Sequence, residues 1–118
     1  MSRTHAAETG IRNLLDLHDT QVEVGAGYWA KFEAHEVAVD ATRPDGIKYS
    51  LTLHAPSGER VIGFDNAHGV KGSRHRRWDH LHPAGGEIRP YAFRDAGKLL
   101  EDFWASVERY MQDRGIWT

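Results

Sequence analysis

Three successive segments in the middle of the chain alternate apolar and polar side chains, and two short turn motifs separate them. The segments are residues 28–40, 47–55 and 59–67, and the turns are RPDG at 43–46 and PSG at 56–58. A period of two is typical of strands with one buried face. Proline presets its own φ and glycine tolerates a positive φ, so these turns favour tight reversals. Strands joined by turns rather than helices predict an antiparallel meander.

Shorter alternating runs come before these segments. Leu15 and Leu17 face one way, and Val22 and Val24 form a second run beyond a turn at 18–20. We therefore expect strand character from residue 14 onward. Residues 1–10 are small and polar and are expected to form a flexible N-terminus. The rest, residues 11–118, is long enough for a single domain with one modest core.

Near the C-terminus the apolar period changes to three and four residues. The apolar positions are Leu99, Leu100, Phe103, Trp104, Val107, Tyr110 and Met111. Asp95 is the predicted N-cap and Gly115 the predicted C′ residue of a helix of about 20 residues. The predicted fold class is therefore α+β, an antiparallel sheet of four to five strands with one long C-terminal helix packed on one face. Ile116 and Trp117 either fold back onto the domain or dock a partner.

Several classes of protein are excluded or disfavoured by composition. The chain has no cysteine, which excludes disulfides, thiolate zinc sites and a cysteine nucleophile. It contains no apolar run near the roughly 20 residues that span a bilayer, and its N-terminus has no apolar signal-peptide core. We expect a cytoplasmic protein that does not associate with membranes.

Positive charge is concentrated between residues 67 and 90, where we expect a basic, histidine-rich loop. Residues 68–90 hold five lysines and arginines against two acidic residues. Arginine matches phosphate geometry, and a tryptophan among arginines can stack on an unpaired base. The predicted nucleic-acid contacts are Lys71, Arg74, Arg76, Arg77, Trp78 and Tyr91, with Arg89 as a further cation. The alternative is a solvated loop that balances an acidic remainder.

The same loop contains four histidines, which suit proton transfer near neutral pH. Cleaving RNA without a metal requires a base, an acid and cations for the phosphorane. The candidate catalytic residues are His68, His75, His80, His82, Asp65 and Arg89. Asp65 or Asp79 could orient an imidazole, but spacing singles out no histidine pair. Alternatively these histidines only solvate the loop.

Two further interpretations concern neighbouring residues. His75, His80 and His82 beside Asp79 have the atoms of a zinc or manganese site, but they match no sharp zinc signature, and we expect no metal or other cofactor. Asp65-Asn66 fits either local turn chemistry or the fixed edge of an active site.

Four motifs follow one another along the chain: GIKYSL at 46–51, SGERVIGFDN at 57–66, RPYAF at 89–93 and LLEDFW at 99–104. Their order resembles that of the TumE-like toxin family of bacterial and archaeal toxin–antitoxin pairs. The resemblance covers about residues 45–112, and its GFDN and LEDF pieces are the most specific. The insert from Gly69 to Gly86 is longer than in compact members, which leaves the roles of His75, His80 and His82 open.

The resemblance implies a growth-inhibiting toxin encoded beside a helix-turn-helix antitoxin, with RNA or the translation apparatus as its target. Among its motif positions, Asp65, His68 and Arg89 have side chains fit for the chemistry. We predict a metal-independent ribonuclease with His68 and one of His75, His80 or His82 as proton-transfer groups. The alternatives are a non-catalytic nucleic-acid or protein-binding module and a small His-ligated metalloenzyme. A homodimer is left open.

Overall fold

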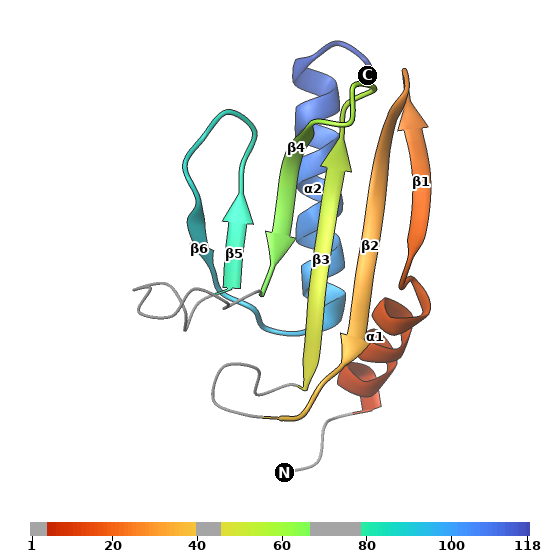
Figure 1. The fold of residues 1–118 in the computed structure, drawn as a ribbon, viewed down its shortest axis with the longest axis vertical. Helices are drawn as coiled ribbons and strands as arrows, with labels where there is room; N and C mark the ends of the chain where they lie inside the picture. Colours follow the sequence, from red (N-terminus) through yellow and green to blue (C-terminus); the bar gives the residue numbers. More distant parts are fainter. Residues whose placement is uncertain (1–4, 40–45, 67–78) are drawn as a thin grey trace.

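The computed structural model describes residues 5–39, 46–66 and 79–118. Six strands form one antiparallel sheet in chain order, accompanied by two helices (Figure 1). The elements are α1 His5–Asp16, β1 Thr20–Gly25, β2 Tyr28–Glu36, β3 Ile47–His54, β4 Arg60–Asp65, β5 Asp79–His82, β6 Arg89–Tyr91 and α2 Ala96–Asp113. The predicted α+β meander with a C-terminal helix is confirmed, with six strands in place of four or five.

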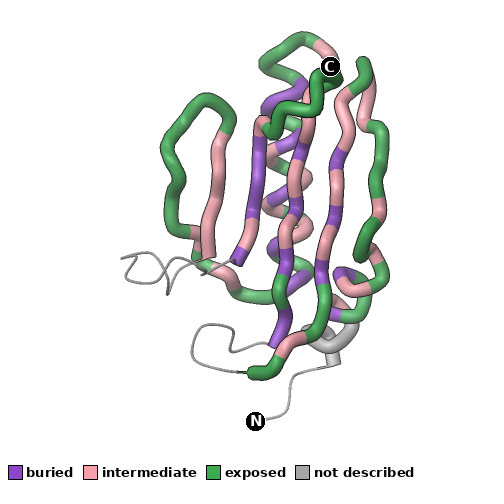
Figure 2. Tube along the Cα trace, viewed as in Figure 1, coloured by how far each residue is buried: buried purple, intermediate pink, exposed green. Residues whose placement is uncertain are grey.

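The core lies between the sheet and the helices. Because strands are pleated, every second residue of β2, β3 and β4 points to the helix side. Phe32, Leu51 and Phe64 occupy adjacent positions across these strands and are buried. The ring centroid of Phe103 in α2 lies 5.5 Å from that of Phe32 and 6.1 Å from that of Phe64. Figure 2 shows the buried positions running along the central strands and α2.

Helix α2 begins and ends where its sequence indicates. Asp95 has an extended backbone, and its Oδ1 accepts a hydrogen bond from the amide of Lys98 at 2.8 Å. Gly115 follows the C-cap residue Arg114 with φ of +73°, a conformation that favours glycine. Both predicted caps are confirmed.

The expected strand at residues 14–17 is wrong, because residues 14–16 are the end of helix α1 and Leu17 lies in the turn that follows. Ile11 and Leu14 are buried at a spacing of three residues, and α1 packs against α2 and β2. The two helices approach closely, since a Cβ at Gly10 would stand 3.2 Å from the amide nitrogen of Gly97. The alternation of Leu15 and Leu17 is confined to these two residues, and the helical spacing of Ile11 and Leu14 determines the structure of this segment. The helix includes residues 5–10; the flexibility predicted for this segment stays a prediction.

The C-terminal part of the predicted basic loop is also regular structure. Residues 79–82 and 89–91 form the β5–β6 hairpin, whereas residues 67–78 lie outside the described residues. At the chain end, Trp117 Nε1 donates a hydrogen bond to the carbonyl of Val24 at 2.8 Å. The C-terminus therefore folds back onto β1. Neither described helix is long and apolar enough to cross a membrane.

Candidate functional site

The candidate site lies on the face of the sheet that points away from the helices. Phe64 of β4 stands opposite Leu81 of β5, and Asp65 stands opposite His80. Phe64 is buried on the helix side, so Asp65 and His80 project from the other face. His82 follows two residues later in β5 and shares that face. Among residues 5–39, 46–66 and 79–118, no helix covers this open face (Figure 1).

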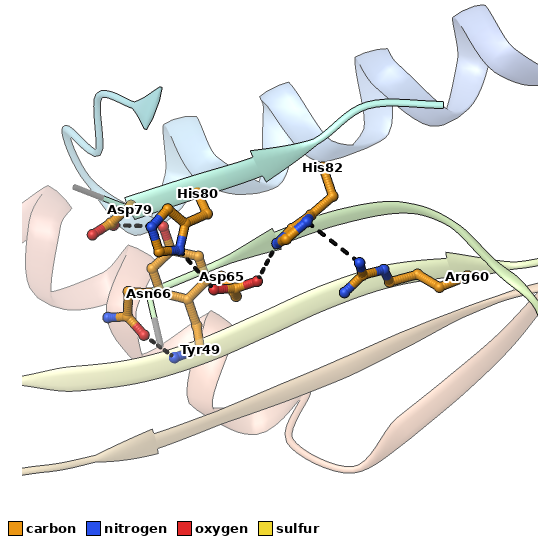
Figure 3. A network of polar contacts seen from close by, with 7 residues as sticks. All are labelled: Tyr49, Arg60, Asp65, Asn66, Asp79, His80 and His82. Carbon is orange, nitrogen blue, oxygen red and sulfur yellow. Dashed lines mark hydrogen bonds and ion pairs between the residues drawn. The ribbon is translucent and has the colours of Figure 1, made fainter. Parts of the chain in front are cut away.

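One carboxylate contacts two imidazoles. Asp65 Oδ2 lies 2.8 Å from His82 Nε2, and Asp65 Oδ1 lies 3.4 Å from His80 Nδ1 (Figure 3). The three side chains are only 16% to 18% exposed. The ring centroids of His80 and His82 are 6.3 Å apart. Partial removal from water strengthens such polar contacts, and each contact restricts the orientation of its imidazole ring.

Arginine 60 extends this network and determines the tautomer of His82. Its Nη2 lies 3.3 Å from His82 Nδ1. A guanidinium only donates, so His82 Nδ1 accepts and His82 Nε2 carries the proton donated to Asp65. Both nitrogens of His82 are thereby engaged. In His80 the nitrogen nearest Asp65 is Nδ1, which lies 3.4 Å from Asp65 Oδ1.

Glycine 63 makes room for this arrangement. A Cβ at Gly63 would lie 3.3 Å from Arg60 Cδ and 3.5 Å from His82 Cδ2. The Arg60 side chain therefore lies over a strand position that has no side chain of its own. Arg60 was not among the residues predicted from the sequence, because its position depends on an irregularity in the β3–β4 pairing beside His54. An isolated glycine within a strand was the available signal of a close approach.

Asn66 holds the end of β4 against β3 and has no part in the histidine network. It is buried, its Nδ2 donates to the Ile47 carbonyl at 2.8 Å, and its Oδ1 accepts from the Tyr49 amide at 2.9 Å. Both ends of the amide are used by backbone groups. The Asp65-Asn66 pair was predicted to serve either local turn chemistry or the edge of an active site. Asn66 therefore has a local structural role, whereas Asp65 faces the candidate site.

Asp79, the other carboxylate expected to orient an imidazole, contacts a phenol. The Tyr49 hydroxyl donates to Asp79 Oδ2 at 2.5 Å. Burial, and then the nearby charge of Asp79, raises the pKa of Tyr49 well above its usual range. The phenol stays protonated, so this contact joins β3 to β5 as a structural hydrogen bond.

The predicted site residues fall into three groups. Asp65, His80 and His82 are brought together on the open face. Arg89 and Tyr91 lie on β6 opposite Leu81 and Asp79, on the helix side, and the Tyr91 hydroxyl donates to Asp102 of α2 at 2.6 Å. Seven predicted residues lie outside the described residues: His68, Lys71, His75, Arg74, Arg76, Arg77 and Trp78.

Two neighbouring features bear on what the site can bind. Beside Asp65 lies a hollow of about 230 Å³, whose lining includes Lys48, Ser50 and His35. Within the part of the chain that the structure describes, no group of three histidine or acidic side chains is arranged to hold a metal ion. His75, which belongs to the expected metal set, is not among these residues.

Comparison with known proteins identifies a family. The family model described as Toxin TumE matches residues 27–111, which include β2 to β6 and most of α2. No curated protein matches the chain, and no solved structure matches it. The matched region contains Arg60, Asp65, His80 and His82.

Proposed function

The chain belongs to the TumE toxin family, and on that basis we propose that it acts on RNA as a metal-independent endoribonuclease. Membership of a toxin family implies an antitoxin partner. The single observation that carries the nuclease proposal is the contact of the Asp65 carboxylate with both His80 and His82. An oriented imidazole beside a carboxylate is a recurring arrangement for moving protons in catalysis.

The proposed reaction is an intramolecular transesterification of RNA, in which the 2′-oxygen of a ribose replaces the 5′-oxygen on the adjacent phosphorus. His80 takes the proton of the 2′-hydroxyl as general base, and the 2′-oxygen forms a bond to phosphorus. The bond from phosphorus to the 5′-oxygen breaks, and an acid returns a proton to that oxygen. The products are a 2′,3′-cyclic phosphate and a 5′-hydroxyl, so atoms and protons balance.

Each residue has a separate role in this proposal. Asp65 orients the imidazole of His80, which is the proposed base. Arg60, 3.3 Å from His82 Nδ1, contributes positive charge toward the phosphorane. Both nitrogens of His82 have partners, and we assign the acid to His68, which the sequence predicts as one of two proton-transfer groups. Lys71, Arg74, Arg76 and Arg77 supply the electrostatic attraction for RNA.

The direct test is incubation of the purified protein with single-stranded RNA in EDTA. We expect cleavage products with cyclic phosphate ends. His80→Ala should lower kcat about a hundredfold or more while RNA binding is retained, because a general base contributes about 10²- to 10⁴-fold. His54→Ala is the matched control: this imidazole is on the same sheet face, but its nitrogens contact Gly58 O and Thr52 Oγ1.

The possible outcomes separate the nuclease from its rivals. RNA that stays intact at high protein concentration overturns the nuclease proposal. RNA that is bound but not cut favours the non-catalytic binding module. Equal losses in His80→Ala and His54→Ala would remove His80 from the reaction.

We also propose that the antitoxin is a helix-turn-helix protein encoded by a neighbouring gene. Co-expression of that gene product with the toxin should restore growth and yield a complex that copurifies. Failure of the two proteins to associate would contradict this part of the proposal.

A further inference from the structure

A second concave region adjoins the histidine network. The β4–β5 pairing joins Gly63–Asp65 to His80–His82, and beyond it the start of β4 is separated from the turn of the β5–β6 hairpin. A cleft of about 530 Å³ lies there. Its lining includes Arg60, His82, Gly85, Gly86, Tyr110 and Arg114. Arg60 and His82 are thus shared between the cleft and the candidate active site.

The charged groups of the cleft favour an anion. Two arginines, Arg60 and Arg114, line it together with one acidic residue, Glu59. Within the part of the chain that the structure describes, neither guanidinium forms an ion pair with a carboxylate. Arginine presents a planar fork of donors suited to phosphate oxygens.

The ring of Tyr110 holds one of these cations, Arg114, in the wall of the cleft. Arg114 Cζ lies 5.0 Å from the centroid of the Tyr110 ring, a cation–π distance. Burial, followed by a hydrogen bond with Tyr28, raises the pKa of Tyr110. Tyr110 therefore stays a neutral phenol and adds no negative charge. On the opposite wall, Gly86 approaches Pro83 so closely that a Cβ would stand 3.0 Å from Pro83 Cγ.

From this geometry we infer that the cleft is a subsite for a backbone phosphate of the nucleotide next to the cleavage position, bound by Arg60 and Arg114. The inference rests on the proposed ribonuclease function. It implies a substrate class, single-stranded RNA of at least three nucleotides. A dinucleotide carries only the phosphate that is cut, so it leaves the subsite empty.

The test compares Arg114→Ala with Arg109→Ala, a matched loss of one arginine from the same helix. Arg109 lines a separate hollow with Ser106 and Arg89. With a tetranucleotide, Arg114→Ala should raise KM about tenfold while kcat changes much less, as expected for one charge-assisted contact. With a dinucleotide the KM defect should be several-fold smaller. Arg109→Ala should keep the KM of the unmodified protein.

Binding is measured separately from cleavage with a fully 2′-O-methylated tetranucleotide, which lacks the attacking hydroxyl. Arg114→Ala should weaken its binding, and the slope of log K against log salt should become shallower by about 0.7. Indistinguishable Arg114→Ala and Arg109→Ala proteins would overturn the subsite and leave the nuclease intact. Arg114-dependent binding without cleavage of unmodified RNA would support the subsite and overturn the nuclease. Absence of both binding and cleavage would overturn both.

Discussion

At the scale of single residues, the proposed reaction depends most on the Asp65 carboxylate, which contacts both His80 and His82. Asp65→Asn keeps the shape but replaces one oxygen by an NH₂ group, which cannot accept from an imidazole. One of His80 and His82 must then reverse its tautomer or lose its partner. We expect kcat for RNA cleavage to fall about a hundredfold with little change in KM, as for loss of a general base.

The matched control is Asp79→Asn. Asp79 accepts from the Tyr49 hydroxyl, so this change should lower thermal stability more than it lowers kcat. Steady-state kinetics and melting curves of both variants give the comparison. If Asp79→Asn loses more kcat than Asp65→Asn, the orienting role belongs to Asp79.

A second residue-scale prediction concerns stability alone. Asn66→Ala removes two hydrogen bonds to buried backbone groups of β3, from the Ile47 carbonyl and the Tyr49 amide. Leaving such groups unsatisfied costs about 1 to 3 kcal/mol each, so the free energy of unfolding should fall by about 3 kcal/mol. Urea denaturation measures it. Asn13→Ala, at an exposed position of α1, should leave stability nearly unchanged; a comparable loss there would contradict the explanation.

At the scale of elements, the glycine in the interior of strand β4 leaves space for the Arg60 side chain of the proposed active site. Gly63→Ala would place a Cβ 3.3 Å from Arg60 Cδ and 3.5 Å from His82 Cδ2. The Arg60 side chain must then shift by a few tenths of an ångström, which weakens its contact with His82. We expect an RNA-cleavage defect of up to about tenfold, the size of one charge-assisted contact, with far-UV circular dichroism unchanged.

Arg60→Ala serves as the comparison for this prediction. If Gly63 acts by making room for Arg60, the double variant should lose little more activity than Arg60→Ala alone. Fully additive losses would indicate that Gly63 acts in another way.

The elements that could be predicted from the sequence are those with a long local pattern. Strands β2, β3 and β4 and helix α2 each bury an uninterrupted apolar series. Helix α1 was missed because the alternation of Leu15 and Leu17 competes with the helical spacing of Ile11, Leu14 and Leu15. Strands β5 and β6 have four and three residues, too few to establish a period.

The candidate site was predicted only in part for a similar reason. His80 and His82 were candidates for their chemistry, and Asp65 for its place at a strand end. Their contact depends on the pairing of Asp65 with His80 across β4 and β5. That register is fixed by tertiary structure, and no spacing along the chain encodes it. Arg89, selected for its charge, lies on the other face because it pairs with Leu81.

At the scale of the whole molecule, the sheet has an open face and a face covered by helices, and phenols on the covered face hold the β5–β6 hairpin. The Tyr49 hydroxyl joins β3 to Asp79 of β5, and the Tyr91 hydroxyl joins β6 to Asp102 of α2. Burial is the first cause that raises the pKa of both tyrosines. The hairpin that carries His80 and His82 is thus attached through two protonated phenols.

This attachment predicts how stability depends on alkaline pH. The folded protein keeps the Tyr49 proton at pH values where the unfolded chain, with a tyrosine pKa of about 10, has lost it. The stabilisation is therefore complete below about pH 10 and declines as pH rises further, by up to about 1.4 kcal/mol per pH unit for one proton. Urea denaturation between pH 8 and 11 should show constant stability from this group and then a fall. Tyr49→Phe should be less stable at pH 8 but should lose stability less steeply above pH 10. Equal slopes in the two proteins would contradict a phenol that must stay protonated to hold the hairpin.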